Sequence, residues 1–218
     1  EDRNGTALVI HHSGRAIDRM TDTLGRTITF AYDSAGRLAS VTDFTGRSVV
    51  YGYDARGDLV SVRSPVVTGT PNGNEFPSGR TTLYCYLGAQ GCNEAALRHN
   101  LASITDARGT TFLTNSYRSA LDPACGEPGT PADSVSAQAY GGGPEPPRVR
   151  YAYAPVAPGQ DPDANVITTE ATVTDRNWNI QVHRFNLQGN PLSIERRTNR
   201  NIRNDEGDYL ETNTYRID

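Results

Sequence analysis

The chain has 218 residues, with 25 acidic residues, 21 arginines, no lysine and a formal net charge of −4 at pH 7. The absence of lysine excludes a P-loop, a Schiff-base site and a kinase-type phosphate site, because each needs that side chain. The acidic balance argues against nucleic-acid binding, and no apolar run approaches the ~20 residues that span a bilayer.

A repeat of 21 residues occupies the first part of the chain. Residues 21–32 (TDTLGRTITFAY) align with residues 42–53 (TDFTGRSVVYGY), and the segments that follow, YDSAGRL and YDARGDL, repeat as well. The pattern Asp-x-x-Gly is typical of a tight turn, because aspartate bonds to its own turn and glycine accepts a positive φ. Four glycines, spaced 11, 10 and 11 residues apart, place two turns in each unit: Gly25, Gly36, Gly46 and Gly57.

Between the turns, side chains alternate with a period of two. Phe30 and Tyr32 share one face of a predicted strand, and Tyr51 and Tyr53 share the matching face one unit later. Each unit therefore predicts a β-hairpin. Hairpins must pair side by side, since a lone hairpin is only marginally stable in water. The predicted fold class is all-β: stacked antiparallel β-hairpin repeats that form a curved strip or a segment of a hollow shell.

Looser copies of the repeat follow. Residues Leu101–Gly109 match Leu38–Gly46 position by position. In the strand that follows, Tyr117 stands one residue later than the tyrosine of the regular repeat. In a later copy Trp178 stands at the glycine position, and Gly189 closes the next turn.

The chain divides into four predicted parts according to how closely each follows the repeat. They are residues 1–63 with regular repeats, 64–121 with degenerate repeats and a loop insertion, 122–165 as a Gly/Pro-rich insertion around a strand at 148–153, and 166–218 with degenerate repeats that stop partway through a hairpin. A further strand is expected over 166–173. Residues 93–99 (NEAALRH) are the only segment that predicts a helix.

The three cysteines leave two alternatives open. Cys85 and Cys92 lie close enough in sequence to be bridged across a turn, which predicts a disulfide between them and leaves Cys125 over. The alternative is that all three cysteines are free thiols.

No set of residues predicts catalysis, a metal or a cofactor. His11 and His12 are adjacent in a predicted strand and so point to opposite faces. The run 161–165 begins like a calcium loop, but Val166 stands where that loop needs glycine. No G-x-S-x-G nucleophile motif occurs. Asp33 and Asp54 recur with the structural period, which indicates turn capping rather than an active site.

The run GRTITFAYDSAGRL at residues 25–38 resembles the consensus of the YD-repeat, or Rhs-repeat, family. The resemblance is strong over residues 21–62 and moderate over 101–117 and 173–194. In that family, hairpins form a long β-strip that coils into a hollow shell, with tyrosines stacking between neighbours. The group includes bacterial Rhs polymorphic toxins, the cocoon of toxin complexes, wall-associated proteins and teneurin-like surface proteins, and the shell typically encloses a toxin or effector.

The resemblance implies a non-enzymatic wall segment that encapsulates or displays an effector polypeptide, within a larger bacterial protein that is secreted or at the cell surface. Its partners would be other shell segments or the enclosed effector. The alternative is an adhesion module that recognises a glycan or a cell-surface protein through Tyr/Arg-rich faces and loops. The residues expected to maintain the repeat are the turn and stacking positions Gly25, Phe30, Tyr32, Asp33, Gly36, Gly46, Tyr51, Tyr53, Asp54, Gly57, Gly109, Tyr117 and Gly189.

Overall fold

The computed structural model describes residues 3, 5–120, 126–128, 133–141, 148–155, 166–198 and 210–216. Apart from one short 3-10 helix, η1 (Leu87–Gln90), the regular structure of this described part is β-strand, which confirms the predicted all-β class. The chain divides into two compact units. The first comprises residues 1–85 and 104–110, and the second comprises residues 86–103 and 111–218.

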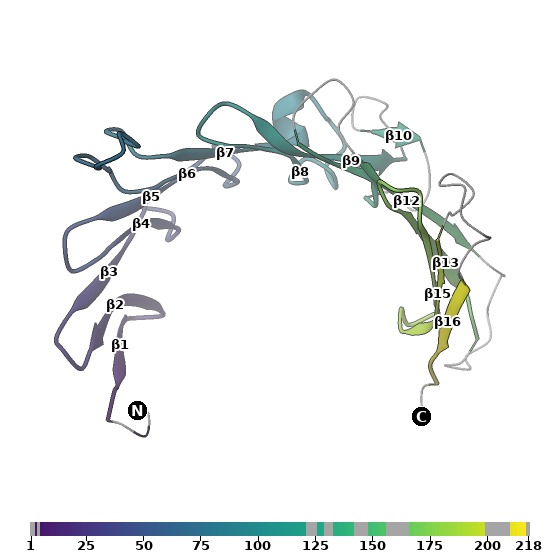
Figure 1. Ribbon diagram of the computed structural model, residues 1–218, viewed down its shortest axis with the longest axis horizontal. Coiled ribbons are helices and arrows are strands. Elements are labelled where there is room, and N and C mark those ends of the chain that lie inside the picture. The colour runs from purple at the N-terminus through teal and green to yellow at the C-terminus, as the bar shows by residue number, and fades with distance from the viewer. Residues whose placement is uncertain are drawn as a thin grey trace. The chain divides into compact units, whose positions relative to one another are not determined.

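The first unit is a run of antiparallel strands in which each strand pairs with the next one in sequence (Figure 1). Short turns join most of them, as the repeat predicts. The strands are β1 (Leu8–Ser13), β2 (Ala16–Asp22), β3 (Thr27–Tyr32), β4 (Leu38–Thr42), β5 (Ser48–Tyr53), β6 (Leu59–Arg63) and β7 (Thr81–Tyr86).

The second unit continues the same architecture with longer connections. Strands β9, β11, β12, β13, β14, β15 and β16 pair antiparallel in that order, while β10 lies parallel to β9. Strands β12 and β13 correspond to the two strands predicted in this region. The bounds are β8 (Leu101–Thr105), β9 (Thr111–Ser119), β10 (Glu127–Pro128), β11 (Val135–Tyr140), β12 (Arg148–Pro155), β13 (Thr169–Thr174), β14 (Ile180–Phe185), β15 (Pro191–Arg197) and β16 (Leu210–Thr214).

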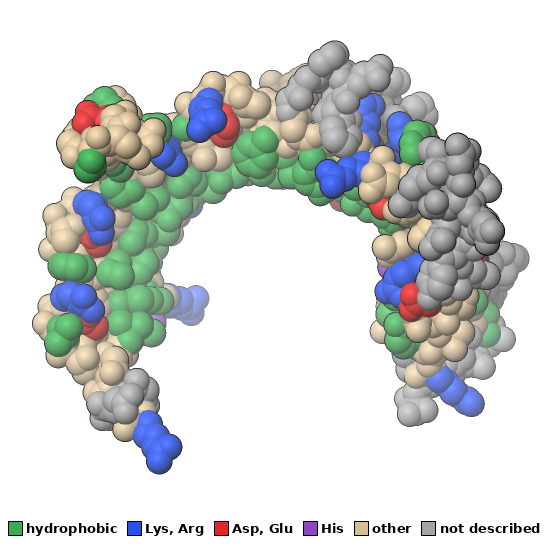
Figure 2. All heavy atoms as spheres, in the orientation of Figure 1, with side chains coloured by type: hydrophobic (Ala, Val, Ile, Leu, Met, Phe, Trp, Pro, Cys, Tyr) green, Lys and Arg blue, Asp and Glu red, His purple; other side chains and the backbone are tan. Residues whose placement is uncertain are grey.

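The strand register gives the first unit two unlike faces, because directly opposed residues lie on the same side of a sheet. One side, here called the apolar face, contains Met20, Ile28, Phe30, Val41, Val49, Tyr51 and Val62. The other side, the polar face, contains mainly small and polar residues, among them Thr29, Ser40, Thr42, Ser48, Val50, Ser61 and Arg63. Figure 2 shows hydrophobic side chains gathered in a band along one side of these strands.

The buried hydrophobic side chains of the described residues all belong to the second unit. The main cluster is Leu87, Cys92, Leu97, Ala102 and Tyr117, and Val135 packs against it. The segment between η1 and β8 supplies two of these side chains, Cys92 and Leu97, so it packs against the strands at the start of the second unit.

The predicted helix at 93–99 is wrong, since residues 95–99 form turns and residues 93–94 have no regular structure. Seven residues are too short to hold a helix without support, and here tertiary contacts decide the conformation. Leu97 is fully buried, and the Glu94 carboxylate accepts a hydrogen bond of 2.6 Å from the Ser119 hydroxyl.

The predicted Cys85–Cys92 disulfide is also wrong. Cys92 is disulfide-bonded, but Cys85 is not part of a disulfide. Between them the chain passes through η1 and a left-handed Gly91 instead of a tight hairpin turn, and Cys92 packs into the buried cluster. Cys125 lies outside the described residues.

Candidate functional site

The repeated hairpin turn is the best-defined polar site of the first unit. In the turn after β4, the Asp43 N–H donates to the Arg47 carbonyl and the Gly46 N–H donates to the Asp43 carbonyl, both at 2.9 Å. Gly46 has a φ of 84°. These features are those of a three-residue hairpin loop closed by a left-handed residue, which explains why glycine recurs at this position.

The aspartate side chain stabilises each turn by accepting hydrogen bonds from residues of the same turn. Oδ1 of Asp43 accepts the N–H groups of Thr45 and Arg47 at 2.9 and 3.1 Å, and its Oδ2 accepts Nε of Arg47 at 2.8 Å. The same contacts occur in two other turns. We call the three pairs Asp22–Arg26, Asp33–Arg37 and Asp43–Arg47 the turn clamps.

Later turns keep this geometry with other residues. Asp175 Oδ1 accepts the N–H of Asn179 at 2.8 Å, and the Asn179 side-chain amide donates to Oδ2 at 2.8 Å, so asparagine replaces arginine. Asn186 replaces aspartate in the next turn and accepts the Asn190 N–H at 2.8 Å. Trp178 takes the glycine position with a φ of 67°, and the Arg150 guanidinium carbon lies 5.1 Å from its ring centroid.

The predicted glycine positions all lie in such turns. Their φ angles are 76° at Gly25, 78° at Gly36, 84° at Gly46, 95° at Gly57, 79° at Gly109 and 82° at Gly189. In the fourth turn Asp54 still accepts the backbone N–H groups of Arg56 and Asp58, although Asp58 stands where the three turn clamps have arginine.

The tyrosine of each Tyr-Asp pair, Tyr32 and Tyr53, joins one hairpin to the preceding one. The Tyr32 hydroxyl donates to the Ile17 carbonyl at 2.8 Å, and the Tyr53 hydroxyl donates to the Leu38 carbonyl at 2.9 Å. In the second unit, Tyr117 donates to the Leu101 carbonyl at 2.9 Å, and burial raises the pKa of its hydroxyl. In all three contacts the tyrosine and the residue whose carbonyl it binds lie 15 or 16 residues apart.

Two clamp arginines also contact aromatic rings that lie 16 to 18 residues further along the chain, and the sequence analysis missed these contacts. The Arg37 guanidinium carbon lies 4.5 Å from the ring centroid of Tyr53, and that of Arg26 lies 5.3 Å from the centroid of Phe44. Each arginine therefore binds its own aspartate and also covers an aromatic ring one repeat later. The spacing of 16 to 18 residues between arginine and ring was visible in the repeat.

The clamps lower the pKa of their carboxyl groups. Hydrogen bonds to the charged form are responsible: from the Thr45 hydroxyl at Asp43, and from the Arg37 backbone N–H at Asp33. At Asp22 and Asp54 desolvation is the largest single effect and raises the pKa, but the hydrogen bonds together outweigh it, so both values also lie below the ordinary one.

A network of four charges crosses β13, β14 and β15. Arg184 binds Glu170 at 2.9 Å and Glu195 at 3.1 Å, and Glu195 also binds Arg197. The hydrogen bond to Glu195 raises the pKa of Arg184, and the hydrogen bond from Arg197 lowers the pKa of Glu195. Glu170, Arg184 and Glu195 lie in three different strands, so their contact could have been predicted only from the strand register.

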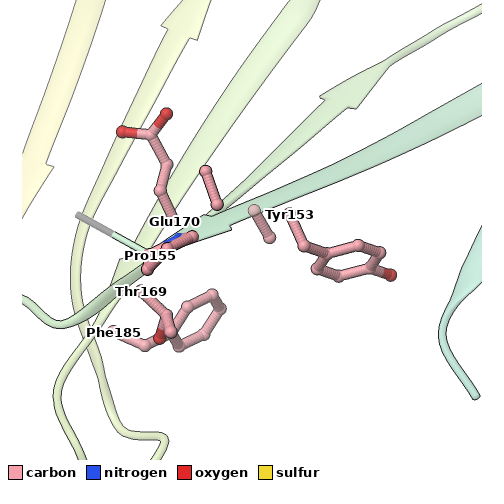
Figure 3. A pocket seen from close by; sticks show the side chains of 7 residues that line it. Tyr153, Pro155, Thr169, Glu170 and Phe185 are labelled. Carbon is pink, nitrogen blue, oxygen red and sulfur yellow. The ribbon is translucent and has the colours of Figure 1, made fainter. Parts of the chain in front are cut away.

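An apolar pocket of about 480 Å³ lies beside this network (Figure 3). Its lining includes Tyr153, Pro155, Thr169 and Phe185. In Figure 3 the Glu170 carboxylate points away from the Phe185 ring, consistent with its bond to Arg184.

The residues that the sequence analysis considered for metal binding do not converge. His11 lies near Arg19, with 3.4 Å between the His11 Nδ1 and an arginine nitrogen. Within the described ranges, no group of three or more His, Cys, Asp or Glu side chains could hold a metal ion. The calcium-like run at 161–165 lies outside those ranges.

Comparison with known proteins identifies the repeat. Residues 12–48 match the model of the RHS repeat family. The curated proteins gave no match.

Three solved structures are similar to the chain at low identity. The TcdB2-TccC3-TEV crystal structure has 12% identity and a TM-score of 0.36 over 89% of this chain, and the Photorhabdus luminescens Tc holotoxin pore with a substituted TccC3 gives the same three values. The TcdB2-TccC3-Cdc42 crystal structure has 13% identity and a TM-score of 0.34 over 88% of this chain. The chain spans only 11 to 12% of the length of those chains.

Replacing Gly46 by valine should lower stability by about 1–3 kcal/mol, because a β-branched residue resists a positive φ. Crowding contributes nothing, since no atom lies within 4 Å of the added Cβ position. Gly46→Asn is the control and should lose less stability, because asparagine tolerates a positive φ. Thermal melting measures both; a valine variant that melts like the parent contradicts the assigned turn.

Replacing Tyr53 by phenylalanine should cost about 0.5–1.5 kcal/mol, the usual net value of one hydrogen bond. The matched control is Tyr51→Phe, because the Tyr51 hydroxyl has no hydrogen bond to any described residue. Urea unfolding of the two variants compares them directly. Equal losses would show that the Tyr53–Leu38 bond does not join the hairpins.

Acid should weaken the turns. Carboxyls whose folded pKa is lowered stabilise the fold fully above their unfolded pKa of about 3.9, and this contribution disappears as the pH falls towards the folded value. Asp43→Asn keeps the Oδ1 acceptor, as Asn186 does, but cannot titrate. The difference in Tm between parent and variant should therefore be constant from pH 7 to 5 and shrink below about pH 4. A difference that stays unchanged down to pH 2 contradicts the clamp.

Proposed function

We propose that the chain is a non-enzymatic wall segment of an Rhs-type β-shell, whose apolar face lies against an enclosed or displayed effector polypeptide. Other segments of the same shell continue the strip on either side. The parent protein is secreted or held at the bacterial cell surface. The RHS repeat at residues 12–48 supports this proposal.

The observation that carries the proposal is the uncovered apolar face of the first unit. Not one hydrophobic side chain among the described residues of this unit is buried, although the apolar face runs continuously through five strands. Ile28 on this face remains 38% exposed. Contiguous apolar surface of this kind is typical of a contact surface, because exposing it to water is unfavourable.

The turn clamps support a structural role. They recur with the same partners in successive hairpin turns, and each aspartate carboxylate accepts hydrogen bonds from its own turn. A catalytic group would need a free functional atom directed at a substrate, whereas the clamp carboxylates are occupied by backbone N–H groups and arginine.

The described helices give no membrane-spanning candidate, since none is long and apolar enough to cross a bilayer. The proposed attachment to a larger secreted or surface protein rests on the repeat resemblance alone.

The test begins with the coding DNA on both sides of the segment. The proposal expects further repeats and a downstream effector sequence. The parent protein is then expressed, and the effector part is assayed for protection from protease. Val49→Ser on the apolar face should reduce protection several-fold, because it weakens the contact with the enclosed chain.

Val50→Ser is the matched control, since it makes the same change in the same strand on the polar face. It should leave protection unchanged. The proposal fails if no repeats flank the segment, if the effector is digested as fast as the isolated effector, or if both variants act alike.

A further inference from the structure

A groove lined by arginine lies on the polar face of the first unit. Two adjoining hollows of about 540 and 670 Å³ share Arg47, Ser64, Pro65 and Val66 as lining residues. They lie between β5 with its preceding turn and the long connection from β6 to β7, which projects from the strip in Figure 1. We call Arg47, Arg63, Ser64, Val66, Ser78 and Arg80 the arginine groove.

The backbone fixes the position of this groove. Arg63 is paired opposite Val50 and therefore lies on the polar face. The Ser64 N–H donates to the Arg80 carbonyl at 2.8 Å, and the Arg80 N–H donates back to the Ser64 hydroxyl at 2.9 Å. At Gly79 an added Cβ would lie 2.2 Å from the Ser64 carbonyl oxygen, so only glycine allows this close approach.

The lining of the groove is positively charged. No carboxylate lines either hollow. Arg47 is bound to Asp43 and keeps a side chain that is 65% exposed. Arg63 and Arg80 have no carboxylate partner within the part of the chain that the structure describes, and the Arg80 guanidinium lies 3.8 Å from the Phe76 ring centroid, which orients it.

The groove offers the three kinds of contact that an acidic sugar needs. Guanidinium groups bind carboxylates through paired hydrogen bonds. The Ser78 hydroxyl matches a sugar hydroxyl, and Val66 with its neighbouring prolines gives an apolar wall for the C–H face of a ring. The volumes lie in the range of small-ligand sites, about 300–1,000 Å³.

A peptide strand fits less well, because the connection has no open edge there. Val67 and Phe76 exchange hydrogen bonds of 3.0 and 2.7 Å, and Ser64 is paired with Arg80. The backbone N–H and C=O groups of these residues already have hydrogen-bond partners, so they cannot pair with an added peptide strand. We propose that the arginine groove binds a carboxylate-bearing sugar, a uronate unit of an acidic polysaccharide.

This inference is independent of the shell proposal, because the groove and the apolar face lie on opposite sides of the sheet. Loss of sugar binding leaves the shell proposal intact, and Val49→Ser should not change sugar binding.

The test is calorimetric titration of the 218-residue chain with trigalacturonate. Its fully methyl-esterified form is the matched neutral probe. The acid form should bind, and the ester should bind at least roughly tenfold more weakly, because a charge-assisted hydrogen bond contributes more than a neutral one. Arg63→Gln and Arg80→Gln should each weaken binding roughly tenfold.

Arg15→Gln is the control variant, since it removes the same charge from an exposed turn outside the groove. It should leave the affinity unchanged, and all three variants should melt within a degree or two of the parent. The proposal is overturned if trigalacturonate does not bind, if the ester binds equally well, or if Arg15→Gln weakens binding as much. It is also overturned if hexaglutamate binds more tightly with the same sensitivity to Arg63 and Arg80, which would make the groove a peptide site.

Discussion

The bond between an aspartate carboxylate and the backbone of its own turn is the interaction on which the rest of the first unit depends. Each clamp fixes where one strand ends and the next begins. In a β-strand a slip of one residue moves every side chain to the other face, so the position of the turn determines which side is apolar. The tyrosine hydroxyls then join each hairpin to the one before it.

A strip held in this way does not need a core of its own. The first unit has no buried hydrophobic side chain among its described residues, and its stability therefore rests on ladders, clamps and aromatic contacts. The consequence is two surfaces with different chemistry. The apolar face suits a polypeptide that covers it, while the polar face carries a groove with arginine and serine. The second unit differs, because the segment from η1 to β8 covers part of its sheet and builds a small core.

The regular repeats were predictable because every determinant is local. Asp-x-x-Gly, the period of two and the 21-residue offset all lie within one unit, so the hairpins, the left-handed glycines and the two faces followed from the sequence. The misses came from long-range contacts. Burial of Leu97 and a bond from Glu94 to Ser119 overrode the helical propensity of residues 93–99. The wrong disulfide has the same cause, since nearness in sequence does not decide pairing. The arginine groove required the fold of residues 64–80, which no motif predicts.

Amide hydrogen exchange of the folded chain tests the central role of the clamps most directly. The Arg47 amide lies at the surface and the Arg37 amide is half-buried, and the carboxylates of Asp43 and Asp33 accept their hydrogen bonds. They should exchange at least roughly tenfold more slowly than the neighbouring turn amides of Ser34 and Phe44. Equal, fast exchange at all four amides would show that the carboxylates do not hold the turns and would contradict the account.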